Sequence, residues 1–223
     1  MNGRPQNIIG YYNIGLLELF MPESEMSDLK DNLIIKDEFA IISNNCWGAE
    51  VYKDFCIPYN TPFVGLFIPP MCFVKLCKNV THYLKKDLEF IETSKYAVYG
   101  RTLLDQKYPL AVLEDVEIHF LHYHSEQEAA SKWQRRLQKI NKDNMLILYA
   151  ARDYATSDSI KAFSELPYKH KLCMAAKPYP LIPLVVYFDE YKHMPEFPGA
   201  DIARTNVAKK IDWIKVLNGL QAK

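Results

Sequence analysis

The sequence predicts an α/β protein in which a mostly parallel sheet is covered by helices on both faces, a three-layer α/β/α arrangement. Short apolar runs typical of buried strands alternate with segments whose apolar residues recur every three or four positions. The chain has 223 residues, 49% hydrophobic and 24% charged, which are ordinary values for a folded domain. We therefore expect a single α/β domain over residues 38–223, preceded by an N-terminal helix and connector over residues 1–37.

The first half of the chain contains two strong strand signals. EFAIIS (38–43) is a short apolar run that stops at Asn44-Asn45, and helical character resumes after Gly48. PFVGLFI (62–68) predicts a second strand, and Pro69-Pro70 then opens a helix. The apolar residues near helical spacing at 8–21 predict the N-terminal helix.

The second half repeats the strand and helix pattern. LAVL (110–113) and EIHFLH (117–122) predict strands, and Ser125 with Glu128 forms a capping box that starts a helix reaching about residue 141. MLILYA (145–150) is typical of a strand buried on both faces, and Thr156 or Ser157 caps a helix to Leu166. HKLCMAA and LVVYF predict further strands, and a last amphipathic helix is expected at 203–218.

Composition excludes several classes of protein. Lysine plus arginine equals aspartate plus glutamate, at 27 each, so the molecule has no overall field that would draw it to nucleic acid. The five cysteines are odd in number and lack CxxC spacing, which predicts free thiols. No apolar stretch approaches the length of a membrane span and no export signal opens the chain, so we expect a cytoplasmic protein without stable membrane insertion.

Cys46 is the candidate nucleophile. It lies just beyond the carboxyl end of the 38–43 strand and just before a helix, where the first-turn amides and the helix dipole favour a thiolate. Gly48 allows close backbone approach to a ligand, and Asn44 and Asn45 can donate hydrogen bonds to an oxyanion. The alternative is a buried structural cysteine in a turn.

A base and an orienting carboxylate are also available. His122 ends the EIHFLH strand and Asp153 follows MLILYA, so in one parallel sheet both would lie at the same carboxyl edge as Cys46. His119 and His124 compete with His122 for the role of base, His119 pointing to the opposite face of the strand. The sequence therefore predicts a Cys-His-Asp site in which His122 is preferred as the base over His119 and His124.

Metal and cofactor chemistry are not expected. The His119, His122 and His124 spacing divides the imidazoles between two faces of a strand, which argues against a zinc site built from them with Asp115, Glu117 or Cys46. The chain contains no GxGxxG, Walker A, HExxH or GxSxG motif.

Basic residues form a stripe on the predicted 125–141 helix. Lys132, Arg135, Arg136 and Lys139 share one helical face and could hold a phosphate or a sugar-nucleotide diphosphate. Such a stripe could also be a solvated face, and acidic residues one turn earlier partly neutralise it. Together with Trp47, Tyr52 and Tyr59, the Arg135–Arg136 pair defines an alternative to catalysis, a module that binds sugar nucleotides or glycans.

Several blocks of sequence resemble one bacterial family of unknown function that is linked to exopolysaccharide biosynthesis. The resemblance covers residues 38–177 and rests on ISNNCWGAEVY, YNTPFVGLFI, LEDVEIHFLHYHSEQEA, KWQRR, INKDN and ARDYAT. It implies a role near capsule or exopolysaccharide synthesis rather than a defined reaction.

A weaker similarity connects the chain with papain-like cysteine peptidases. It implies that Cys46 is the nucleophile and His122 or His119 its partner, although Ala49 stands where that pattern usually has a second glycine. We therefore expect a cysteine-dependent acyl transferase or hydrolase that acts on a small-molecule or glycan-precursor substrate. The last predicted helix offers a surface for homo-oligomers or for a place in a polysaccharide assembly complex.

Overall fold

A four-stranded parallel sheet forms the centre of the molecule in the computed structural model, which describes residues 31–34, 38–99 and 108–220. Its strands lie in the order β1-β5-β6-β7, and every neighbouring pair is parallel. Their bounds are Ala40–Ser43 for β1, Met145–Ala150 for β5, Lys171–Ala175 for β6 and Val185–Tyr187 for β7. The predicted α/β class with a mostly parallel sheet is confirmed.

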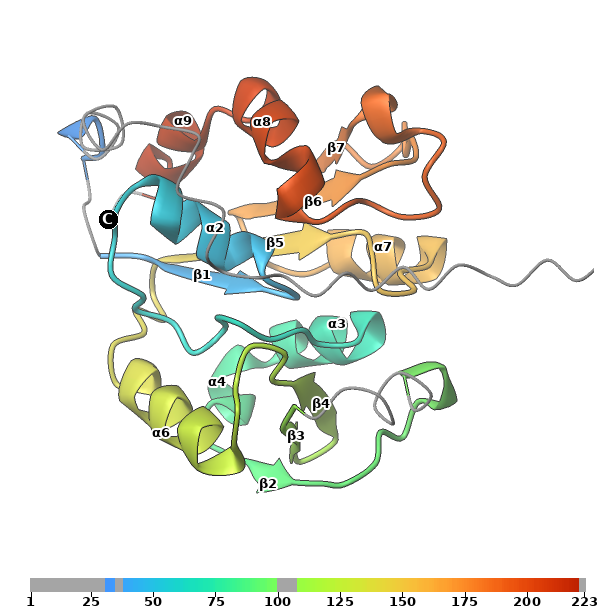
Figure 1. Ribbon diagram of the computed structural model, residues 1–223. Helices are drawn as coiled ribbons and strands as arrows, with labels where there is room; N and C mark the ends of the chain where they lie inside the picture. Colours follow the sequence, from blue (N-terminus) through green and yellow to red (C-terminus); the bar gives the residue numbers. More distant parts are fainter. Residues whose placement is uncertain (1–30, 35–37, 100–107, 221–223) are drawn as a thin grey trace, which may run out of the picture.

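Helices cover both faces of this sheet (Figure 1). One face carries α2 (Trp47–Asp54), α8 (Ala200–Lys210) and α9 (Trp213–Asn218), and the other carries α3 (Pro70–Lys78) and α7 (Ser157–Ser164). Alternate residues of the strands enter two separate cores: Ile41 and Leu148 pack toward α2, α8 and α9, whereas Ile42 and Tyr149 pack toward α3 and α7. A short 3₁₀ helix, η2 (Asp189–Tyr191), follows β7.

A second, antiparallel sheet lies beyond α3 (Figure 1). It consists of β2 (Glu89–Phe90), β3 (Leu110–Leu113) and β4 (Val116–His119), and it is accompanied by α4 (Val80–Tyr83) and α6 (Glu126–Leu137). The prediction that EIHFLH belongs to the parallel sheet is therefore wrong. Only two residues, Glu114 and Asp115, separate β3 from β4, and so short a connection can form only a hairpin.

Two other predicted elements differ in extent. Residues 62–68 form an irregular segment in place of the predicted strand, with bends at residues 62, 64 and 65 and a left-handed Gly65 at φ +72°. The segment pairs with β4 through a single bridge between Phe67 and His119. The helix expected at 203–218 breaks at Ile211, and Asp212 caps α9 by accepting a hydrogen bond from the Lys215 amide. The helix predicted at 8–21 lies outside the described residues.

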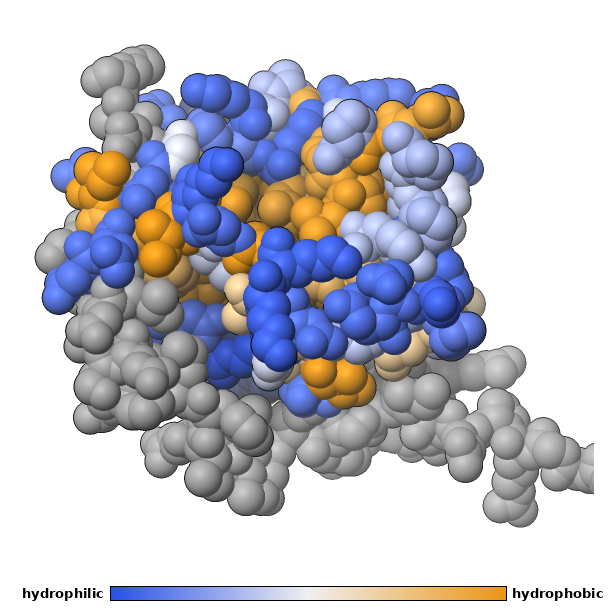
Figure 2. Space-filling view, turned by 90° about the horizontal axis from the view of Figure 1, so that it is seen from above, coloured by the Kyte–Doolittle hydropathy of each residue, from blue (hydrophilic) through white to orange (hydrophobic). Residues whose placement is uncertain are grey.

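Both predicted N-cap residues cap their helices. Ser125 accepts from the Glu128 amide at the start of α6, but the Glu128 carboxylate accepts from the His124 amide and does not complete the predicted capping box. Thr156 forms a capping box with Ser159 at the start of α7. Within the described ranges, no helix is both long enough and apolar enough to traverse a lipid bilayer. The face formed by α2, α8 and α9 presents hydrophobic side chains set among hydrophilic ones (Figure 2).

Candidate functional site

The loops that follow β1 and β5 start side by side at the carboxyl edge of the parallel sheet. The two strands are adjacent and parallel, but the chain leaves β1 toward α2 on one face and leaves β5 toward α7 on the other. Ligands of open α/β sheets commonly bind where connections diverge in this way. Cys46 lies in the loop after β1 and Asp153 in the loop after β5, so the structure places both at the predicted edge.

Cys46 is the N-cap residue of α2 and is half-buried. Its Sγ lies 4.0 Å from the carbonyl oxygen of Leu66. Burial, followed by the negative charges of Glu50 and Asp153, raises the pKa of Cys46 to about 12. The thiol is therefore protonated at neutral pH, because desolvation outweighs the effect expected from the helix dipole.

The two asparagines before Cys46 have different surroundings. Asn44 is fully buried, and its side-chain amide accepts from the Ala150 amide at 2.9 Å and donates to the Ala150 carbonyl at 3.0 Å. Asn44 thus joins the ends of β1 and β5 and faces no open site. Asn45 accepts from the Trp47 amide at 3.2 Å, but its Nδ2 is buried and has no hydrogen-bond partner among the described residues.

Trp47, Gly48 and Tyr52 stabilise α2 against the sheet and do not face solvent. The Trp47 indole donates to the Pro198 carbonyl at 3.2 Å, and the Tyr52 hydroxyl accepts from the Ile41 amide at 3.0 Å. A Cβ at Gly48 would lie 2.8 Å from the Cβ of Ser43, so this glycine permits close packing of helix on strand rather than approach of a ligand. The sequence-based roles of these three residues in binding are therefore not supported by their positions.

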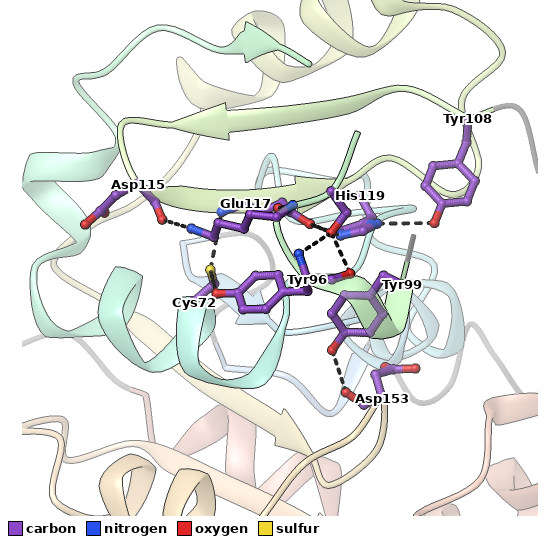
Figure 3. A network of polar contacts seen from close by, with 10 residues as sticks. Cys72, Tyr96, Tyr99, Tyr108, Asp115, Glu117, His119 and Asp153 are labelled. Atoms are coloured by element: carbon purple, nitrogen blue, oxygen red, sulfur yellow. Dashed lines mark hydrogen bonds and ion pairs between the residues drawn. The ribbon is translucent and has the colours of Figure 1, made fainter. Parts of the chain in front are cut away.

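His119 lies in a buried polar network of the second sheet, which Figure 3 shows. Its Nε2 is 2.7 Å from Glu117, and its Nδ1 is 3.2 Å from the Tyr108 hydroxyl. Both side chains of the His-Glu pair are 0% exposed. Glu117 also accepts from the Ser94 hydroxyl and, at 3.0 Å, from the Lys95 amide.

These contacts fix the ionisation of the pair. Burial lowers the pKa of His119 despite the opposing charge of Glu117, so we assign a neutral imidazole that donates from Nε2. Burial acts to raise the pKa of Glu117, but the hydrogen bonds from His119 and Ser94 outweigh it and hold the pKa below its usual value. Both nitrogens of His119 have partners, which leaves His122 as the more accessible candidate base.

His122 and His124 are exposed and lie in the turn before α6. Partial burial and the nearby charge of Lys53 lower the pKa of His122, and its backbone amide donates to the Gly65 carbonyl at 3.0 Å. Within the described ranges, no three His, Cys, Asp or Glu side chains gather in a way that could hold a metal ion.

Asp153 has an unusual backbone. Asp153 and Tyr154 are both left-handed, with φ values of 58° and 65°, a conformation that is strained for residues with a Cβ. The carboxylate of Glu196 accepts from the Asp153 amide at 2.7 Å, and Tyr99 donates to the Asp153 carbonyl at 2.8 Å. Glu196 and Tyr99 were not predicted from the sequence, because neither lies near a recognisable motif.

The basic stripe continues beyond the end of α6 at Leu137, earlier than the predicted end near residue 141, and borders a cavity of about 310 Å³. The lining residues are Pro58, Tyr59, Arg135, Arg136 and Lys139, and we call this cavity the basic pocket. Arg136 is 9% exposed; its Nη1 donates to the Tyr123 hydroxyl at 2.7 Å, and its guanidinium lies 5.2 Å from the centre of the Tyr59 ring. Lys132, the remaining member of the stripe, is ion-paired with Glu128 at 2.6 Å.

Comparison with known proteins gives a family but no reaction. Residues 19–218 match the family described as Domain of unknown function (DUF1919). A protein of Haemophilus influenzae named "Uncharacterized protein" is 39% identical over 152 residues, which are 68% of each chain. The family match extends past the predicted 38–177 region and includes β7, α8 and α9.

Proposed function

The chain belongs to the DUF1919 family, a domain of unknown function, and we propose that it binds a phosphorylated glycan precursor, such as a sugar nucleotide, in the basic pocket. The proposal includes a role in exopolysaccharide or capsule synthesis, which the resemblance of the sequence motifs implies. The ligand class is inferred from the positive charge of the pocket lining. No carboxylate is among the lining residues.

The observation that carries the proposal is the burial of Arg136. A buried guanidinium is costly unless it is paired with a negative charge. Within the described part of the chain, Arg136 forms no ion pair; its guanidinium donates to the neutral Tyr123 hydroxyl and lies over the Tyr59 ring. A ligand phosphate would supply the missing negative charge.

Arg135 and Lys139 supply two further cations at the mouth of the pocket. Both are exposed, and neither has an ion-pair partner in the described ranges. Basic residues are favoured at the C-terminal end of a helix, which accounts for their presence at the surface. That preference does not account for the buried Arg136 between them.

Isothermal titration calorimetry with UDP-glucose tests the proposal. The Arg135→Ala, Lys139→Ala double variant removes two exposed cations and leaves the Arg136–Tyr123 contact intact. We expect its affinity to fall at least about ten-fold, because hydrogen bonds to charged groups contribute about 1.5–3 kcal/mol each.

Lys132→Ala is the matched control, since this lysine lies on the same helix but is already paired with Glu128. Its affinity should remain near that of the original protein. Equal losses in both variants would indicate a general charge effect, and no binding to the original protein would refute the proposal.

A second candidate function is acyl transfer by Cys46, and the unpartnered Asn45 amide favours it. The sulfur would attack the carbonyl carbon of an acyl thioester and form a new thioester, while the thiol proton passes to His122 and the donor thiolate leaves. Attack by a sugar hydroxyl on the new thioester would release the acylated sugar and restore the thiol. Asn45 would donate to the carbonyl oxygen as negative charge develops there.

Mass spectrometry after incubation with an acetyl thioester tests this second function. We expect acetyl on Cys46 but not on the exposed Cys56, and slower acetylation in a His122→Gln variant. Equal labelling of both cysteines, or no labelling of Cys46, would count against it.

A further inference from the structure

We propose that a ligand held in the basic pocket extends along residues Val64–Leu66 to Cys46, so that the group attached to its phosphate lies beside this thiol and Asn45. This inference rests on the proposed function and specifies its ligand. It joins two features that the sequence presents as alternatives, the thiol and the basic stripe.

The first step is the connection between the pocket and Val64. Arg136 donates to the Tyr123 hydroxyl at 2.7 Å, and that hydroxyl donates to the Val64 carbonyl at 2.6 Å. The wall of the pocket is thus hydrogen-bonded, through Tyr123, to the 62–68 segment that precedes α3.

The second step is the short distance from Val64, along the chain to Leu66, and from there to the Cys46 thiol. The Leu66 carbonyl lies 4.0 Å from the Cys46 Sγ, and two residues of chain span at most about 7 Å. A single sugar joined to a phosphate could therefore reach from the pocket to the thiol.

Gly65 allows the backbone between Val64 and Leu66 to lie close against the 122–123 turn. It has φ +72°, and a Cβ there would lie 3.2 Å from the Tyr123 ring and 3.3 Å from the Cβ of His122. The backbone at this point therefore runs against the same turn that supplies Tyr123 to the pocket and His122 to the surface.

Asn45 provides the reason to place a ligand group at the far end of the route. It is 5% exposed, and because its Oδ1 accepts from the Trp47 amide, the partnerless atom is the Nδ2 donor. A buried donor without an acceptor is unfavourable by about 1–3 kcal/mol. A hydroxyl or carbonyl oxygen of the ligand would satisfy it.

The ligand class is therefore a glycosyl diphosphate, with the diphosphate in the basic pocket and the sugar extending toward Cys46. A soluble nucleotide sugar and a lipid-linked sugar diphosphate share this chemistry. UDP-glucose and a short-chain prenyl diphosphate glucose represent the two sources.

Competition between ligand binding and alkylation tests the inference in the complete chain. Iodoacetamide labelling is followed by mass spectrometry at Cys46, with the exposed Cys56 as an internal reference. At about ten times its Kd, a ligand that covers Cys46 should slow labelling there about ten-fold, since that is the fall in the free fraction, and leave Cys56 unchanged. Inorganic pyrophosphate should bind the pocket without protecting Cys46.

Protection by either glycosyl diphosphate supports the inference and identifies the source. Calorimetric binding without protection of Cys46 would overturn the inference and leave the proposed function standing. Equal protection by pyrophosphate would also overturn it, because the effect would not require a sugar. Absence of any binding would refute both, and loss of protection in the Arg135→Ala, Lys139→Ala variant would confirm that the route begins at the pocket.

Discussion

Among the described residues, the buried Arg136 has no ion-pair partner, and the buried Asn45 Nδ2, like the Trp133 indole nitrogen, has no hydrogen-bond partner. In a folded protein most buried polar groups are hydrogen-bonded, and most buried charges are paired. The neighbouring Asn44 follows this rule, since its side-chain amide both donates a hydrogen bond to the Ala150 carbonyl and accepts one from the Ala150 amide. We therefore expect neighbouring asparagines to have separable roles, one in stability and one in binding.

Alanine substitution should separate those roles. Asn44→Ala leaves the Ala150 amide and carbonyl without partners inside the core, so the free energy of unfolding should fall by about 2–4 kcal/mol. Asn45→Ala removes one hydrogen bond, to Trp47, and should cost less than about 1 kcal/mol. Urea unfolding monitored by tryptophan fluorescence measures both.

The same pair of variants also tests the binding role. Asn45→Ala should weaken UDP-glucose binding while its unfolding midpoint stays close to that of the original protein. If Asn45→Ala destabilises the protein as much as Asn44→Ala, the unpartnered amide has a structural role, and its assignment to a ligand is wrong.

Among the secondary-structure elements, the strands of the parallel sheet and the helix N-caps followed from local pattern, but the placement of β3 and β4 in a separate antiparallel sheet did not. Apolar runs identified β1, β5, β6 and β7, and cap residues identified the starts of α6 and α7. The two-residue connection before β4 was a visible hairpin signal, as Asp212 was for the break before α9. Each signal consists of only one or two residues, so the apolar pattern on either side of it dominated the prediction.

The candidate site was partly predictable for a related reason. Helical spacing placed Arg135, Arg136 and Lys139 on one face, and strand ends placed Cys46 and Asp153 at one edge. Tyr123 and the Val64–Leu66 segment connect these groups through contacts between distant parts of the chain. The periodicity of one helix or strand cannot predict such contacts between segments that are distant in the sequence.

On the scale of the whole molecule, the second sheet is joined to the rest through Phe67. The backbone of Phe67 bridges to His119, and its ring stacks on the imidazole with centroids 4.1 Å apart. The Ile68 amide, in turn, donates to the Asn44 carbonyl at the end of β1 at 2.8 Å. A change in the charge of His119 would therefore act where the antiparallel and parallel parts of the molecule meet.

This arrangement predicts that the protein becomes less stable in mild acid. Because folding lowers the pKa of His119 below 6.5, the unfolded chain binds a proton first, and stability is lost as the pH falls below about 6.5. The lowered pKa of Glu117 extends the loss below pH 4.5. Each proton taken up only by the unfolded chain contributes a slope of at most about 1.4 kcal/mol per pH unit.

Urea unfolding at several pH values between 5.5 and 7 measures this slope. His119→Gln should lower stability at neutral pH and also flatten the slope, because the titrating group is gone from both states. His122→Gln removes an exposed imidazole whose pKa is also lowered, and it gives the size of that smaller contribution. A slope that is the same in His119→Gln as in the original protein would place the acid-sensitive group elsewhere, and the imidazole between the two sheets would then have a purely structural role.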